Sequence, residues 1–330
     1  MKVSDFNYHL PPELIAQTPL ADRSASRMLV VHRDSGRLDD RQFSDLPEYL
    51  GSGDCLVLND SRVFPSRLFG HRPSGGKVEV LLLRQLEPRL WTALVKPGRS
   101  LQPGAKIQFE ANLTAAITGR ADLGERTIRF DGPVEEMLDK IGHIPLPPYI
   151  KRPDEAADRE RYQTVYAQHN GSVAAPTAGL HFTPGILAEC KAKGATTAAV
   201  TLHVGLGTFQ PLTTDEVSEV RLHPERFQIE ADSADLMRQA KRLIAVGTTS
   251  LRTIESAGIT AGSGETTLFI APGYQFRHAG ALLTNFHLPG TSLLLLVAAF
   301  AGVDLSQRAY AHAVEMGYRF YSYGDCMFIT

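Results

Sequence analysis

The chain has 330 residues, 43% of them hydrophobic and 21% charged, which is the composition of an ordinary globular protein with one large or two ordinary domains. Residues 1–12 show no basic region followed by an apolar run, so we expect no secretory signal, and the longest apolar run, 293–301, is about half of a membrane span. The three cysteines fit a reducing cytoplasm and argue against a disulfide framework or a zinc knuckle (Cys55, Cys190 and Cys326).

Charge is spread unevenly along the chain. The net charge is −2, but residues 61–106 hold nine basic and two acidic residues, a balance of +7 that leaves −9 for the rest. The basic residues are Arg62, Arg67, Arg72, Lys77, Arg84, Arg89, Lys96, Arg99 and Lys106. A basic segment on an acidic body is what binding to phosphates requires. The alternative is a solvated β-sheet surface that is basic without a partner.

The N-terminal region begins with short strands. Residues 28–32 and 38–43 predict a hairpin, residues 44–50 a short helix, and residues 55–58 a buried strand. That strand ends in a polar loop, 59–63, and the carboxyl end of a strand is where α/β sheets usually bind ligands. From 67 to 130 only short strands and turns follow. The strands at 77–86, 90–96, 106–109, 113–118 and 126–130 predict a small β-barrel.

A return to the first region is predicted after the barrel. Residues 134–141 predict a helix ended by Gly142, residues 143–150 are extended because they contain three prolines, and residues 154–168 predict a charged helix. We therefore predict a discontinuous α/β domain of residues 1–65 and 143–330. Residues 66–142 form an inserted β-barrel domain.

Helices and strands then alternate, which predicts an α/β body with a mixed sheet. The expected helices are 184–193, 214–220, 233–243, 251–256, 291–301 and 305–316. The expected strands are 196–202, 226–229, 244–246, 268–270, 281–283 and 326–329.

Four histidines lie in or next to loops of this body: His181, His203, His223 and His287. None shows a metal-ligand spacing, so we expect no metal site. Each histidine alone suits a structural hydrogen bond, and together they suit acid–base chemistry near neutral pH.

Two glycine-containing loops resemble phosphate-binding motifs only in part. Residues 205–207 lack the third glycine of a dinucleotide fingerprint, and residues 247–250 lack the lysine of a P-loop. The second loop precedes a helix, whose N-terminus suits either an anion or an ordinary cap. The aromatic residues of 318–325 suit stacking on a base or facing a sulfonium cation, or a place in the core.

Two functional classes therefore remain: a metal-independent enzyme for a nucleotide-like substrate, and a non-catalytic RNA-binding protein. A metal-dependent nucleotide hydrolase is a further alternative. Polar loops at strand ends favour an enzyme, because a pure binder has little need of so many. These loops contain Asn59, His181, His203, Arg252, Asn285 and Asp325.

Long motifs then point to a known family. They include residues 14–19, 26–29, 58–63, 76–82, 145–150, 162–167, 171–182, 200–211, 247–253, 283–289 and 318–325. With these motifs the chain resembles the S-adenosylmethionine:tRNA ribosyltransferase-isomerases of queuosine biosynthesis. Two positions depart from the family pattern: Pro224 in a loop that usually reads Met-His-Ser-Glu, and Gly290 where a charged residue is usual.

The resemblance implies an unusual reaction. The ribosyl group of S-adenosylmethionine moves onto 7-aminomethyl-7-deazaguanine at the tRNA wobble position and is isomerised, giving epoxyqueuosine with release of adenine and methionine. The implied partners are tRNAs with GUN anticodons (those for Asp, Asn, His and Tyr). S-adenosylmethionine is consumed as a substrate and no cofactor is implied. The chemistry needs a base near the ribose C5′ protons, an acid for departing adenine and a dry pocket. We expect a cytoplasmic monomer.

The loops at strand ends are expected to converge on one pocket. His203 or His181 is expected to be the general base, Arg252 to bind the methionine carboxylate, and Asp60 and Asp325 to bind ribose hydroxyls or the amine. The other expected substrate-binding residues are Asn59, Arg62, Thr177, Gly205, Gly207, Thr208, Thr248, Glu225, Asn285, His287 and Tyr323.

Overall fold

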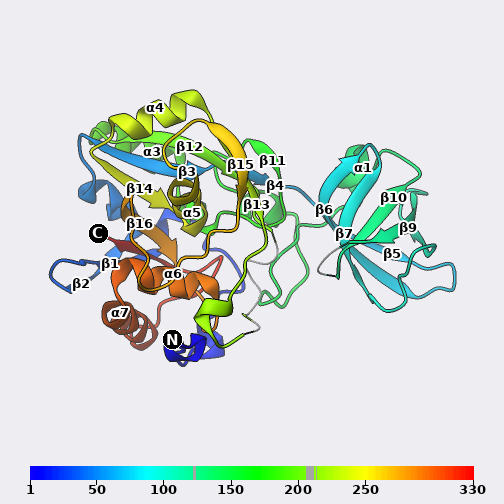
Figure 1. The fold of residues 1–330 in the computed structure, drawn as a ribbon, viewed down its shortest axis with the longest axis horizontal. Helices are drawn as coiled ribbons and strands as arrows, with labels where there is room; N and C mark the ends of the chain where they lie inside the picture. Colours follow the sequence, from blue (N-terminus) through cyan, green and yellow to red (C-terminus); the bar gives the residue numbers. More distant parts are fainter. Residues whose placement is uncertain (122–123, 206–211, 213) are drawn as a thin grey trace.

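A computed structural model of the chain describes residues 1–121, 124–205, 212 and 214–330. It consists of a large α/β body and a smaller β-barrel beside it (Figure 1). The predicted class, a mixed-sheet α/β fold with a small β-barrel, is confirmed.

The body is built on a nine-stranded sheet in the order β15-β13-β12-β3-β14-β16-β17-β1-β2. Its central strands β12, β3, β14 and β16 are parallel, while β17 is antiparallel to β16 and β1 is parallel to β17. The carboxyl ends of the four parallel strands therefore meet the amino ends of β17 and β1, at what we call the site edge. The bounds are β1 Arg27–Val31, β2 Leu38–Gln42, β3 Asp54–Asn59, β12 Thr196–Leu202, β13 Glu225–Ile229, β14 Arg242–Val246, β15 Gly262–Thr266, β16 Ala279–Asn285 and β17 Cys326–Ile329.

Both faces of β3, β14 and β16 are largely buried, which explains why the middle of each strand is apolar. In β3, Cys55 and Val57 pack on one side, and Leu56 and Leu58 on the other. The first side is covered by helices α4 to α7, and the second by α3 and the 3-10 helix Phe43–Tyr49. The helix bounds are α3 Pro184–Ala192, α4 Ala231–Gln239, α5 Thr248–Ala257, α6 Ser292–Ala301 and α7 Val303–Glu315.

The barrel is closed, with strand order β10-β7-β6-β5-β8-β9. Alternate residues point inward, as Ile107 and Phe109 do from β8, and the inner side chains form a separate apolar core. Helix α1 packs Val134 and Leu138 against that core. The bounds are β5 Arg67–His71, β6 Lys77–Glu87, β7 Leu90–Lys96, β8 Lys106–Phe109, β9 Thr114–Arg120, β10 Arg126–Phe130 and α1 Val134–Ile141.

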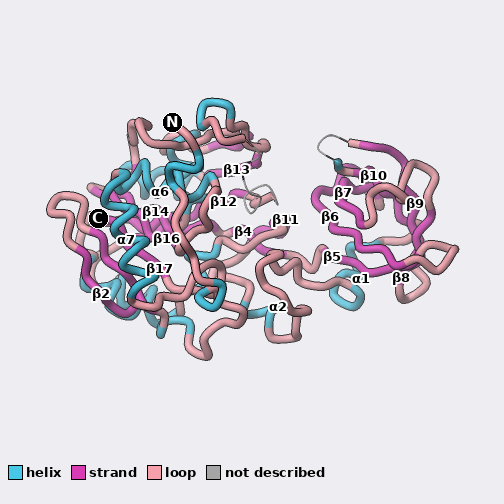
Figure 2. The backbone as a smooth tube through the Cα atoms, turned by 90° about the horizontal axis from the view of Figure 1, so that it is seen from below, coloured by secondary structure: helices cyan, strands magenta, loops and turns pink. Residues whose placement is uncertain are grey.

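Both connections between body and barrel run from the site edge. After β3, the chain forms β4 Ser61–Val63 and then enters the barrel. β4 pairs with β11 His169–Ser172, and this two-stranded sheet lies between the body and the barrel (Figure 2). The return segment passes through His143, which forms an isolated bridge with Arg67. The barrel is therefore attached beside the edge at which we expected ligands.

Three sequence-based predictions of secondary structure are wrong. The helix expected over 154–168 is only α2 Asp158–Arg161, because the chain turns at Tyr162 and the buried Gln163 side chain bonds to the backbone of Val63 in β4. The helix expected over 214–220 is a 3-10 turn, Val217–Glu219, within the described residues. Residues 268–270 are not a strand, and β15 takes the sheet edge instead.

Within the described ranges, every helix taken singly is too short or too polar to cross a membrane. Among the described helices, α6 and α7 together are the one pair that meets the length and composition for a span, and they are bent by 115° at their junction.

Candidate active site

A pocket opens at the site edge, beside the carboxyl ends of β14 and β16. Several of the loops predicted to converge contribute to it, together with the segment that precedes β17. The lining residues are Tyr149, Ala175, Pro176, Thr177, Ala178, Val204, Gly247, Thr248, Thr249, Thr284, Asn285, Phe286, His287, Leu288, Thr291, Leu293, Tyr321 and Ser322. Of the expected substrate-binding residues, Thr177, Thr248, Asn285 and His287 therefore lie at the pocket.

The N-terminus of α5 forms one wall. Gly247 has φ +90°, which glycine adopts without strain, and it turns the chain from β14 directly into the helix. The first N–H groups of a helix have no acceptor within the helix and carry its positive dipole end. This wall therefore suits a carboxylate or another anion.

Two stacked tyrosines form another wall. The rings of Tyr149 and Tyr321 lie 4.1 Å apart at 26°, and the Tyr149 hydroxyl is 2.5 Å from Ser322 Oγ. Tyr321 has φ +73°, a conformation that bulky residues rarely adopt and that is often found at functional sites. Tyr318 and Phe320, by contrast, are fully buried in the body core. The aromatic segment thus divides between core and pocket.

His181 is buried behind the pocket, and both of its ring nitrogens are occupied. Nδ1 is 2.6 Å from Ser26 Oγ, and Nε2 is 3.1 Å from Asn285 Oδ1. Because the Asn285 amide donates to Tyr321 O at 2.8 Å, its oxygen must accept from His181 Nε2–H. Burial lowers the pKa of His181 to about 4. This histidine therefore holds Asn285 in place, and through it the Tyr321 backbone.

His287 lines the pocket itself. Its Nε2 is 2.8 Å from Thr284 Oγ1, its backbone N–H donates to the Tyr310 hydroxyl, and its carbonyl accepts from the Tyr8 hydroxyl. Burial lowers the pKa of His287 to about 3, so the ring is neutral near pH 7.

His203 and Asp60 lie next to the pocket at the ends of β12 and β3. The Asp60 carboxylate accepts from Thr201 Oγ1 at 2.6 Å and is 3.5 Å from His169 Nε2. Burial raises the pKa of Asp60. His203 packs against Gly171, its Nδ1 is buried without a partner among the described residues, and burial lowers its pKa. The pocket is lined by the following Val204 instead.

Arg252 and Glu225 form a buried ion pair, each less than a tenth exposed. Arg252 Nε also donates to Leu268 O at 3.0 Å, and Glu225 accepts from Gly205 N at 3.2 Å. The Nη2 group of Arg252 has no hydrogen-bond partner in the described part of the chain. Gly207 and Thr208, which follow this contact, lie outside the described residues.

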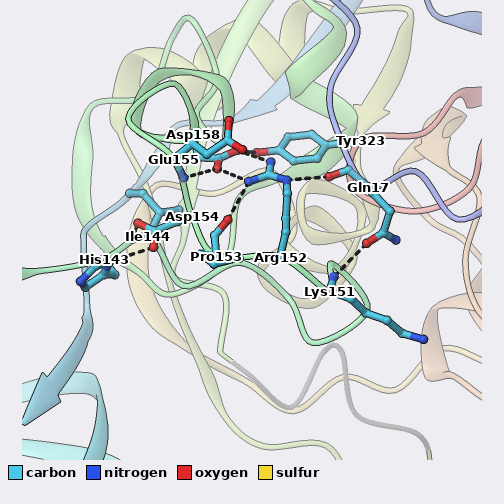
Figure 3. A network of polar contacts seen from close by, with 10 residues as sticks. All are labelled: Gln17, His143, Ile144, Lys151, Arg152, Pro153, Asp154, Glu155, Asp158 and Tyr323. Atoms are coloured by element: carbon cyan, nitrogen blue, oxygen red, sulfur yellow. Dashed lines mark hydrogen bonds and ion pairs between the residues drawn. The ribbon is translucent and has the colours of Figure 1, made fainter.

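The side chains of Asp325 and Tyr323 make hydrogen bonds to other residues of the protein. Asp325 accepts from the backbone N–H groups of Arg27 and Arg319 at 2.9 and 2.8 Å, and burial raises its pKa. The Tyr323 hydroxyl donates to Asp158, which also binds Arg152 through both oxygens (Figure 3).

Asn59, the last residue of β3, forms four hydrogen bonds with its side-chain amide. It accepts from Ser61 N and Leu202 N, and donates to Leu202 O and Thr249 Oγ1. It thereby ties β3, β12 and α5 together and positions Thr249 at the pocket. Arg62 is exposed on β4, between body and barrel.

Sequence reasoning missed Tyr149, Thr284 and Ser322 as pocket residues, and it considered Tyr321 only as one of the aromatic residues of 318–325 that suit either stacking or the core. Tyr149 follows two prolines in the return segment. From the sequence, this segment is predicted only to link the barrel to the body. Among the residues that the structure describes, no group of three or more His, Cys, Asp or Glu side chains is arranged to hold a metal ion.

Comparison with known proteins identifies the family. The family described as "Queuosine biosynthesis protein" matches residues 3–329. The chain belongs to this family. A relative from Solibacter usitatus, named S-adenosylmethionine:tRNA ribosyltransferase-isomerase, is 59% identical over 100% of both chains. A relative of the same name from Syntrophomonas wolfei is 50% identical, covering 99% of this chain and 97% of its own.

A solved family structure agrees with the fold. The crystal structure of S-adenosylmethionine tRNA ribosyltransferase from Thermotoga maritima matches 99% of this chain and 100% of its own, with 36% identity and a TM-score of 0.57. The resemblance noted from the motifs is therefore confirmed, and so is the expectation of a transferase-isomerase enzyme of queuosine biosynthesis.

Proposed function

We propose that this enzyme transfers and isomerises the ribosyl group of S-adenosylmethionine onto 7-aminomethyl-7-deazaguanine in the wobble position of tRNA. Adenine and methionine leave, and epoxyqueuosine remains in the tRNA. The family membership supports the reaction class, and the pocket at the site edge supports the place where it occurs.

The observation that carries this assignment is the pairing of two pocket walls. The N-terminus of α5 presents N–H groups and a positive dipole end, which suit the methionine carboxylate. The stacked Tyr149 and Tyr321 present aromatic surface, which suits a nucleobase or the sulfonium cation. One molecule of S-adenosylmethionine has all of these groups.

The tRNA is proposed to bind across the barrel and the site edge. The exposed Arg62, Arg84 and Arg89 provide positive charge for the phosphates along this route. The wobble nucleotide lies in a single-stranded loop, whose bases can turn outward and stack on aromatic side chains. The proposed substrates are tRNAs with GUN anticodons, and the enzyme acts as a cytoplasmic monomer without cofactor or metal.

The test is incubation of the protein with S-adenosylmethionine and tRNA that carries the deazaguanine precursor, followed by mass analysis of the nucleosides. We expect epoxyqueuosine together with equal amounts of adenine and methionine. Methylated nucleosides, or activity that a chelator abolishes and zinc restores, would exclude the proposal in favour of a methyltransferase or a metal-dependent hydrolase.

A further inference from the structure

Four histidines stand close to the site edge (His169, His181, His203 and His287), and among the described residues His287 is the one that lines the pocket. His181 uses both nitrogens within the protein, on Ser26 and Asn285. His203 is next to the pocket but does not line it, and its Nδ1 is buried against Gly171. His287 lines the pocket, and no hydrogen bond from a described residue reaches its Nδ1.

The hydrogen bonds of Thr284 allow the ring proton of His287 to be on Nε2. Thr284 Oγ1 lies 2.8 Å from Nε2 and 3.4 Å from the carbonyl of Asn285, to which the hydroxyl can donate. With its proton directed there, Thr284 accepts from Nε2–H. In this tautomer the lone pair of the imidazole is on Nδ1, for which the described residues provide no hydrogen-bond partner.

The backbone of His287 is clamped on both sides. Tyr310 accepts from its N–H at 3.0 Å and Tyr8 donates to its carbonyl at 2.5 Å, while the two tyrosine rings pack 4.9 Å apart. A group held in this way is preorganised for chemistry, because its position does not have to be found during the reaction. A neutral imidazole also avoids repulsion of the sulfonium, which an imidazolium would cause.

We propose that His287 is the general base of the reaction and acts through Nδ1. This inference rests on the proposed function. The C5′–H bond of the ribosyl group breaks, the proton moves to Nδ1, and the electron pair stays on C5′ beside the positive sulfur. The C5′ pair then forms a C4′=C5′ bond, the C4′–O4′ bond breaks, and the O4′ pair forms a C1′=O bond as the C1′–N9 bond breaks. The imidazolium protonates the departing adenine, so adenine leaves as the neutral base and His287 is restored.

Two substitutions at this position separate chemistry from structure. The amide of His287→Gln can still bond to Thr284 but has no basic nitrogen, and His287→Ala leaves room for added imidazole. His312→Gln on α7 is the matched control, because the Nε2 of His312 also binds a side chain, that of Asp40, far from the pocket. His203→Gln tests the histidine that the sequence favoured.

Adenine release is measured in single turnovers with saturating S-adenosylmethionine and tRNA that carries the precursor. We expect His287→Gln to lower the rate by about 10²–10⁴-fold, the range of general acid–base catalysis. Its affinity for S-adenosylmethionine should change little, and His312→Gln should match the wild type. Added imidazoles should restore His287→Ala, and more basic imidazoles should restore it better, which filling of a cavity would not produce.

Equal rates for His287→Gln and the wild type would overturn the inference, as would rescue of His287→Ala that is absent or independent of imidazole basicity. If His203→Gln alone loses the chemical step, His203 is the base. If the wild type releases no adenine, the proposed function fails. If the wild type is active and only His287 proves dispensable, the further inference alone fails.

Discussion

At the scale of single residues, the polar side chains of the site edge divide into those that line the pocket and those that hold its walls. Thr177, Thr248 and His287 line it. Asn59 and Asp325 are saturated by hydrogen bonds from the protein, and each joins segments that are distant in sequence. A polar residue at a strand end can therefore support a wall of the pocket instead of lining it.

Arg252 illustrates the difference, because the sequence predicts that it binds a carboxylate and the structure pairs it with Glu225. We expect Arg252→Ala to destabilise the fold by about 3–5 kcal/mol, since it leaves a buried charge without its partner. The double substitution Arg252→Met with Glu225→Leu should recover most of that loss. Urea unfolding measures both values.

The same double variant also tests the binding role of Arg252. If S-adenosylmethionine binds it as tightly as the wild type, Arg252 only stabilises the fold. If binding is lost while stability is recovered, the free Nη2 group contacts the substrate, as the sequence predicts.

His181 is expected to affect stability more than chemistry. The His181→Ala change leaves Asn285 Oδ1 and Ser26 Oγ without this partner, which should cost about 1–3 kcal/mol in the free energy of unfolding. His181→Gln, which keeps a donor near the position of Nε2, should lose less. Unchanged unfolding of the Ala variant, combined with a lost chemical step, would instead support His181 as the base.

At the scale of elements, the sequence predicted regular segments well and irregular ones poorly. The bounds of α1, β12 and β17 agree with the predictions, because their apolar pattern and flanking glycines act locally. The short strands β4 and β11 were missed, since their pairing depends on contacts more than a hundred residues apart. The choice between pocket and core was left open for Tyr321, because its left-handed backbone follows from tertiary packing.

The return segment, residues 143–158, has a charge network that the sequence did not reveal. Burial would raise the pKa of Asp158, but hydrogen bonds from Arg152, from the Glu155 backbone and from Tyr323 outweigh it and lower the pKa (Figure 3). A carboxyl whose pKa is lower in the folded state stabilises the protein above its unfolded value, about 4, and loses that contribution as the pH falls through the folded value.

Asp158→Asn should therefore cost most stability at pH 7, and the cost should shrink below about pH 4. Urea unfolding of the variant and the wild type across this range measures the difference in the free energy of unfolding. The contributions of the other carboxyl groups are the same in both proteins and cancel in this difference. A cost that is the same at every pH would mean that the charge of Asp158 contributes nothing and that only its shape matters.

At the scale of the whole molecule, the barrel is attached to the body on the same side as the pocket. The chain leaves the body just after β3 and returns through the segment that supplies Tyr149 to the pocket wall, so both crossings lie at the site edge (Figures 1 and 2). The amino ends of the parallel strands, at the opposite edge, are far from these crossings. A tRNA held by the barrel would thus be presented to the pocket side of the sheet.

This arrangement leads to a testable prediction, that the basic residues of the barrel bind the tRNA. Changing Arg72, Arg84 and Arg89 together to Glu should weaken tRNA binding and flatten its dependence on salt, because fewer counterions are released when fewer cations meet phosphates. Arg84 and Arg89 are exposed, and Arg72 is half-buried beside Gly76. Binding is measured by titration of labelled tRNA over a range of salt concentrations.

The matched control carries the same change of charge at the opposite edge of the sheet. Lys191, Lys193 and Lys241 are exposed and lie just before β12 and β14 begin, so their change to Glu alters the net charge equally without approaching the site edge. If net charge alone attracts tRNA, both triple variants will lose affinity to the same extent. If the barrel holds the tRNA, only the first will lose affinity and salt dependence. An unaffected first variant would assign the tRNA path to the α/β body, with the exposed Arg62 on β4 as the next residue to change.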